Sequence, residues 1–237
     1  MAETIRSVLC GERWRLDSRS IVDLDFNADG TGRMIFGGEI IFYIAAEFDW
    51  SAEDSAILDQ IIHRASDEGN EPCLLTEFDL NLTLTKRAIP FSGTYPIPRH
   101  TINEGRLEES AFVPRTFSVR LEKGSFISPH DMCDGRVFRT TRRYALRLSF
   151  DETPYPPTDT WKPDRLPLDP MQIEGWTAFY CEPMPLGDEF EIWEWNKHSD
   201  YAIRNRKMEA ANGGSETNGT NRTSGANGSS VEGDKEL

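Results

Sequence analysis

The chain has 237 residues, and 40 Asp and Glu against 26 Lys and Arg give it a formal net charge of −14 at pH 7. A domain this acidic repels nucleic acid phosphates and anionic lipid headgroups, so we expect neither a nucleic acid nor a membrane as partner. The longest apolar run, 40–46, has only the length of a strand, and the first residues lack the apolar stretch of a signal peptide, so we expect a cytoplasmic protein.

Apolar and polar residues alternate along much of the chain, which predicts β-strands with one buried face. In the first run Asp23 and Asp25 separate apolar residues, and a turn containing Asp29-Gly30 joins it to the second run, as in a β-hairpin. The apolar residues of these runs are, in chain order, Val22, Leu24 and Phe26; Met34 and Phe36; Ile40, Phe42, Ile44, Ala46, Phe48 and Trp50; Phe78, Leu80, Leu82 and Leu84; Phe117, Val119 and Leu121; Tyr144, Leu146, Leu148 and Phe150; and Phe190 and Ile192. Because strands do not alternate with helices, we predict a mainly β fold, an antiparallel barrel, with a β-sandwich as the alternative.

One or two short helices are expected beside the strands. Ser51-Ala-Glu-Asp54 resembles the capping box of a helix that ends near Arg64. The segment 57–62 carries an apolar stripe at helical spacing, which supports this helix. A second short helix is predicted after Ser199.

Two segments depart in composition from the rest of the chain. Residues 211–237 are rich in Gly, Ser, Asn and Thr and contain no aromatic residue, so we predict a disordered tail. Residues 153–170 contain six prolines together with Tyr155 and Trp161, and we expect an ordered, extended flap that lies against the domain. The chain therefore divides into one barrel-like domain, 1–210, and the tail.

Three patterns resemble metal or acid–base sites, and none is complete. Residues 25–30 match the opening of an EF-hand loop, but Phe36 stands where that loop requires a bidentate Glu, so a hairpin turn is expected. The loop 129–135 holds His, Cys and Asp without further ligands, and we expect a polar loop. Glu47 and Asp49 share the second face of an apolar strand, where burial would raise the pKa of a carboxyl group. The four cysteines match no zinc or redox spacing and are expected to be free thiols, and we expect no metal and no cofactor.

Gly11 and Trp14 precede the first predicted hairpin, which turns through Asp29-Gly-Thr-Gly32. This arrangement resembles the start of lipocalin-like (calycin) barrels, in which the Trp of a Gly-x-Trp motif closes one end of the barrel; here the spacing is Gly-x-x-Trp. The resemblance implies an antiparallel lipocalin-like barrel with an internal pocket for a small apolar molecule. The overall pattern also resembles uncharacterised fungal proteins.

The sequence contains no catalytic constellation, so we expect a binding protein and not an enzyme. We predict that the barrel binds a small apolar molecule. The aromatic residues expected to line its pocket are Phe42, Phe48, Phe78, Phe117 and Tyr144. Two alternatives stay open: a protein-interaction module that uses the acidic face and the aromatic flap, and a cofactor-free cyclase or isomerase of the lipocalin-like type.

Overall fold

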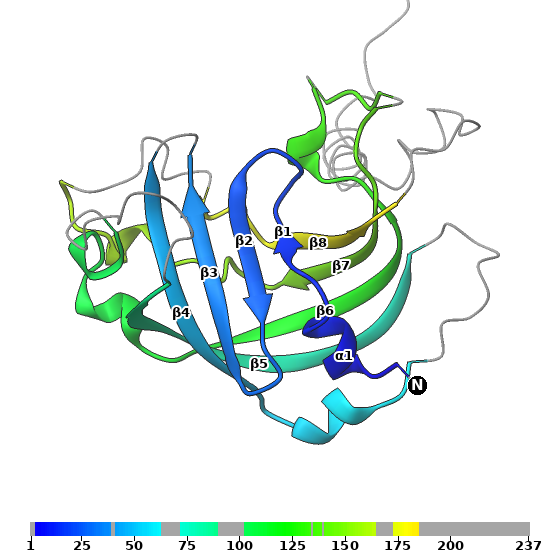
Figure 1. The fold of residues 1–237 in the computed structure, drawn as a ribbon, viewed down its shortest axis with the longest axis horizontal. Coiled ribbons are helices and arrows are strands. Elements are labelled where there is room, and N and C mark those ends of the chain that lie inside the picture. Colours follow the sequence, from blue (N-terminus) through cyan, green and yellow to red (C-terminus); the bar gives the residue numbers. More distant parts are fainter. Residues whose placement is uncertain are drawn as a thin grey trace, which may run out of the picture.

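Eight antiparallel strands form a closed barrel, in which each strand pairs with its neighbour in sequence and the last strand returns to the first (Figure 1). The structure is a computed structural model that describes residues 3–38, 41–62, 72–89, 102–133, 135–138, 140–164 and 173–184. The strands are β1 (Trp14–Arg15), β2 (Ile21–Phe26), β3 (Thr31–Gly37), β4 (Phe42–Ala52), β5 (Cys73–Ala88), β6 (Arg115–Phe126), β7 (Tyr144–Phe150) and β8 (Ala178–Pro183). The predicted antiparallel barrel is confirmed, and the β-sandwich alternative is not.

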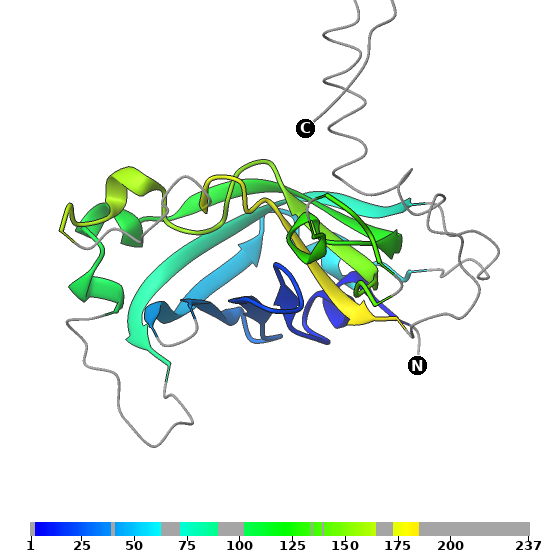
Figure 2. The ribbon, with the colours of Figure 1, turned by 90° about the horizontal axis from the view of Figure 1, so that it is seen from above.

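Seen from above, β5 and β6 lie on one side of the barrel and β1 to β3 on the other (Figure 2). The first predicted hairpin is also confirmed, since β2 and β3 pair from Ile21 and Gly37 to Phe26 and Gly32. In the turn, Gly30 adopts a φ of 86°, and the Asp29 carboxylate accepts hydrogen bonds from the backbone and side chain of Thr31. The EF-hand-like residues 25–30 therefore end a strand and build a turn.

The helices of the described residues are short. They are α1 (Ile5–Leu9) and the 3-10 helices η1 (Ser55–Asp59), η3 (Asn103–Gly105), η4 (Glu109–Phe112), η5 (Pro129–Asp131) and η6 (Thr158–Thr160). Helix α1, which the sequence analysis missed, starts at a Thr4 cap and lies beside the barrel (Figure 1). Within the described part of the chain, no helix has both the length and the apolarity to cross a bilayer.

The prediction that a helix starts at Ser51 is wrong. Ser51 and Ala52 belong to β4, because the longer strand β5 continues to pair with them. The capping residue is Asp54, whose carboxylate accepts from the amide of Ala56, and the 3-10 helix that follows ends at Asp59, because Gln60 is extended and Ile61 forms a β-bridge with Thr4. Tertiary pairing thus overrides the local capping signal. The end predicted near Arg64 lies outside the described residues, as do the second predicted helix and the tail.

Strand β8 was not predicted from the sequence. Its consecutive residues Phe179, Tyr180 and Cys181 are all buried, so the alternation that identifies a half-exposed strand is absent. The strand predicted at Phe190 and Ile192 lies outside the described residues.

Large side chains pack the inside of the barrel. Phe48 and Phe117 are fully buried, and the ring centroids of Phe26 and Phe48 lie 5.3 Å apart. Gly32 makes room for this packing, because a Cβ at that position would lie 2.2 Å from the Phe48 ring. The interior of an eight-stranded barrel is only a few side chains wide, and these buried rings occupy part of it.

The Pro-rich segment packs against the barrel over residues 153–164. Tyr155 is fully buried, and its hydroxyl lies 3.0 Å from the carbonyl oxygen of Asp23 and 2.7 Å from that of Ile35. The ring of Tyr155 stacks on Phe179 of β8, with centroids 6.1 Å apart. Trp161 is also buried, so the aromatic residues of the flap serve the core. The rest of the predicted flap, 165–170, lies outside the described residues.

Replacing Tyr155 by Phe removes one hydroxyl and leaves the ring in place. We expect the free energy of unfolding to fall by about 1–2 kcal/mol, because a buried hydrogen bond to the β2 and β3 carbonyls is lost. Chemical denaturation measures this change. Tyr43→Phe is the matched control, since the Tyr43 hydroxyl makes no hydrogen bond to the described residues and the substitution keeps the ring that contacts Phe36 and Arg106. Equal effects of the two substitutions would contradict the role given to the Tyr155 hydroxyl.

Candidate functional site

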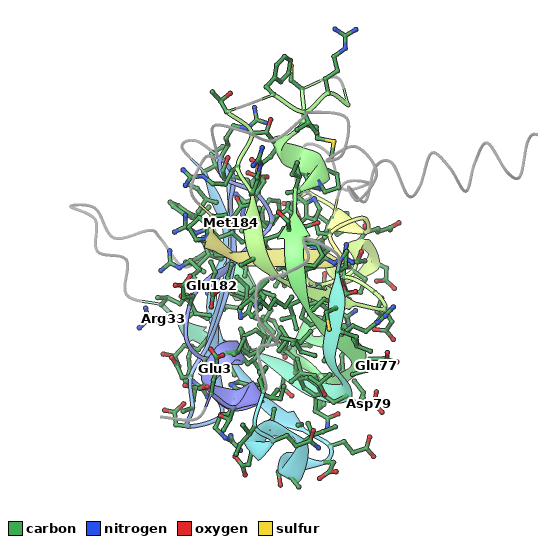
Figure 3. The ribbon with its side chains drawn as sticks, turned by 90° about the vertical axis from the view of Figure 1, so that its right-hand side faces the viewer. Glu3, Arg33, Glu77, Asp79, Glu182 and Met184 are labelled. Atoms are coloured by element: carbon green, nitrogen blue, oxygen red, sulfur yellow. The ribbon has the colours of Figure 1, made fainter. Side chains whose placement is uncertain are left out.

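The barrel closes at a seam where β1 meets β8 through a single residue pair, Arg15 with Tyr180. Beyond that pair the ladder stops, because Glu182 adopts a left-handed φ of 55° and Pro183 has no amide hydrogen to donate. The amide of Glu182 instead donates to the side-chain carboxylate of Glu12 over 3.1 Å. Figure 3 labels Glu182 and Met184 where the chain leaves β8.

The interrupted seam leaves a pocket of about 380 Å³ that is partly open to solvent. Three arginines and two tyrosines dominate its lining, which is unexpected in so acidic a chain. The lining residues are Glu12, Arg13, Arg15, Ser18, Arg142, Tyr144, Tyr180, Cys181, Glu182 and Pro183. They come from both ends of the described chain and from the residues at the start of β7, so barrel closure alone brings them together.

The three arginines differ in their partners. Arg13 forms ion pairs with Asp23 at 3.3 Å and with Asp25 at 3.2 Å. Arg15 forms one longer ion pair, 3.9 Å, with Asp23. Arg142 is exposed and forms no hydrogen bond or ion pair with any residue that the structure describes. One guanidinium group is therefore available to a ligand, and two are held by carboxylates of β2.

Asp23 is the buried acid of this site, with 9% of its side chain exposed. Burial raises the pKa of its carboxyl group to about 6, although the neighbouring charges of Arg13 and Arg15 act to lower it. Its Oδ1 atom is buried and has no hydrogen-bond partner among the residues that the structure describes. A carboxylate with this pKa changes charge between mildly acidic and neutral pH.

Tyr144 and Tyr180 form the aromatic part of the pocket, with ring centroids 5.4 Å apart. The Tyr144 hydroxyl donates to Asp131 of η5 over 3.2 Å, and the other oxygen of Asp131 accepts from the backbone and side chain of Ser18. Burial, followed by the charge of Asp131, raises the pKa of Tyr144, so this phenol stays neutral. Asp131 thereby ties the loop 129–133 to the edge of the pocket.

The structure gives Asp131 this structural role in the loop that the sequence suggested as a metal-ligand cluster. No group of three or more potential metal ligands occurs among the described residues. Asp134, which belongs to the predicted cluster, lies outside the described residues. Glu47 and Asp49 are not buried acids either. Both pair with Arg87 on the barrel surface, and their side chains are 36% and 53% exposed.

The structure places one of the five residues predicted to line a ligand pocket, Tyr144, in the seam pocket. Phe48, Phe78 and Phe117 are buried in the packed core. Phe42 is partly buried at the start of β4, where its ring covers Gly37. The five residues are therefore not brought together around one described cavity.

The sequence reasoning missed the arginines of the pocket. Arg13 and Arg15 flank Trp14, and this spacing places them together on one face of a strand, which is a signal visible in the sequence. Trp14 itself is fully buried, and its indole N–H donates to the carbonyl oxygen of Leu9 in α1 over 2.9 Å. No signal in the sequence joins these residues to Arg142 or Tyr180.

No family model matches this chain, and neither does any curated protein or solved structure.

Replacing Asp23 by Asn removes the buried charge and keeps the shape of the side chain. A carboxyl group whose folded-state pKa is raised favours folding below its unfolded pKa, and this contribution is lost as pH rises through about 6. We therefore expect Asp23→Asn to match the natural chain near pH 4 and to be more stable by about 2–3 kcal/mol near pH 8, which is about 1.4 kcal/mol for each unit by which the pKa is raised. Thermal unfolding across this range measures the difference. Asp25→Asn is the control, and a pH-independent difference for Asp23→Asn would contradict the assignment.

Proposed function

We propose that this protein is a small-molecule binding barrel whose seam pocket takes an amphipathic organic anion. The observation that carries the proposal is the gathering of three arginines and two tyrosines around one pocket of about 380 Å³. Ligand pockets are commonly about 300–1,000 Å³, lined by apolar and aromatic groups with a few polar anchors. The seam pocket has this size, and Tyr144, Tyr180, Cys181 and Pro183 give it apolar surface beside its charged residues.

Arg142 is the anchor for the negative group of the ligand. A guanidinium offers paired N–H donors whose geometry matches a carboxylate, sulfonate or phosphate. Among the described residues, Arg142 is the pocket arginine without an ion pair, so binding an anion there breaks no existing interaction. Tyr144 and Tyr180 offer aromatic surface to the body of the ligand.

This proposal moves the binding site from the barrel interior to the seam. The sequence predicted a small apolar ligand inside the barrel, but Phe48 and Phe117 are packed core residues. The resemblance to lipocalin-like barrels is kept as part of the proposal. It is supported by the closed antiparallel barrel and by the buried Trp14 next to α1.

The two alternatives gain less support. An interaction module that docks a partner on the aromatic flap needs accessible rings, whereas Tyr155 and Trp161 are buried. For a cyclase or isomerase, the buried acid Asp23 lies behind the arginines and does not itself line the pocket, so it does not reach a substrate bound there. The four cysteines are free thiols, which supports a reducing compartment such as the cytoplasm.

Anilinonaphthalene sulfonate tests the proposal, because its fluorescence reports binding and its uncharged parent, phenylnaphthylamine, lacks only the sulfonate. We expect saturable binding of the sulfonate to the full chain and much weaker binding of the uncharged dye. Arg142→Gln should weaken sulfonate binding about tenfold, which corresponds to the loss of one charge-assisted hydrogen-bonded pair.

Arg120→Gln is the matched control, since Arg120 is an exposed arginine of β6 that pairs with Glu77 and does not line the pocket. Because this dye also binds loosely folded states, each variant must keep a cooperative unfolding transition. Equal affinity for the two dyes, or unchanged binding by Arg142→Gln, would refute an anion site at the seam.

A further inference from the structure

Asp23 lies at the junction of the charged groups of the seam. It faces Arg15 of β1 and Arg13 just before that strand, and along its own strand the nearest charge is Asp25. Its register partner on β3 is the uncharged Ile35, and the segment 151–164 contributes the hydroxyl of Tyr155 to its carbonyl oxygen. The carboxylate is therefore buried between two arginines that both line the pocket.

We propose that the seam pocket takes up a proton at Asp23 when it binds an anion, so that ligand binding tightens as the solution becomes acidic. This inference rests on the proposed function, because it concerns the regulation of the same pocket. It makes Asp23 a positioning residue, which acts on the ligand through the arginines and does not touch it.

The partners of the arginines give the mechanism. While Asp23 is ionised it holds Arg15, which pairs with no other carboxylate of the described residues, and it shares Arg13 with Asp25. When Asp23 is neutral, Arg13 keeps Asp25 as its partner, whereas Arg15 loses its counter-ion. Protonation thus changes the pocket from one available guanidinium, that of Arg142, to two.

The proton comes from solvent and forms an O–H bond on the Asp23 carboxylate. An anion in the pocket disfavours the ionised form of Asp23 by repulsion and by competition for Arg15, so it must raise the pKa of this carboxyl group. In the unliganded protein the pKa is about 6, because burial outweighs the two arginines. A further rise on binding therefore falls in the range from mildly acidic to neutral pH, where the protonated fraction changes most.

The test is a titration of the full chain with anilinonaphthalene sulfonate at pH 5.5 and 7.5, since the sulfonate stays ionised throughout. We expect binding about three- to sixfold tighter at pH 5.5, about sixfold being the effect over this range of a pKa rise of one unit. Calorimetry in two buffers of different ionisation enthalpy should show net proton uptake near pH 6.5.

Matched variants separate Asp23 from other groups. Asp23→Asn should bind with pH-independent affinity close to that of the natural chain at pH 5.5, whereas Asp25→Asn should keep the pH dependence. His130→Gln should also keep it; His130 lies in η5, near the pocket edge, and imidazoles in general titrate in this range. The carbon-13 shift of the Asp23 carboxyl group in the natural chain, titrated with and without the dye, tests the same coupling without any substitution.

The outcomes distinguish the two proposals. Absence of saturable sulfonate binding at both pH values would refute the anion site itself. Saturable binding that requires Arg142 but has the same affinity at both pH values, with an unshifted Asp23 titration, would refute only the proton coupling. A pH dependence that persists in Asp23→Asn and disappears in His130→Gln would assign the coupled proton to the histidine and overturn the inference.

Discussion

The closure of this barrel depends on one residue pair between its first and last strands, Arg15 with Tyr180. Every other neighbouring pair of strands from β2 to β8 forms a longer ladder, so backbone hydrogen bonds hold the sheet together everywhere except at the seam. An open sheet edge exposes unpaired backbone groups. Side chains must therefore complete the closure that β1, with two residues, is too short to provide.

Two sets of side chains do this from opposite faces of the sheet. On the inner face, Tyr155 enters the core, stacks on Phe179 of β8 and bonds to carbonyl groups of β2 and β3. On the outer face, Arg15 of β1 and Arg13, which precedes that strand, pair with Asp23 of β2. The same shortage of backbone pairing leaves a gap beside β8, and the charged side chains that line it make it a candidate binding site.

The sequence predicts the walls of the barrel better than its closure. Apolar residues at every second position identify β2 to β7, whereas the consecutive apolar residues Phe179, Tyr180 and Cys181 give β8 no such pattern. The helix expected at Ser51 fails because that residue still pairs with Asn81 of β5, and local signals do not report such pairing. The aromatic residues chosen as pocket walls share their pattern with core residues, and Phe48 proves to be core.

The seam site was beyond the reach of local patterns. Arg13 and Arg15 are visible as a pair around Trp14, but Arg142 and Tyr180 join them from more than half the chain away. Backbone amide chemical shifts, recorded by NMR while anilinonaphthalene sulfonate is added to the full chain, test this account most directly. Binding at the seam predicts the largest changes at Arg15, Tyr180 and Glu182. Largest changes at the interior residues Phe48 and Phe117 would instead place the ligand inside the barrel and contradict it.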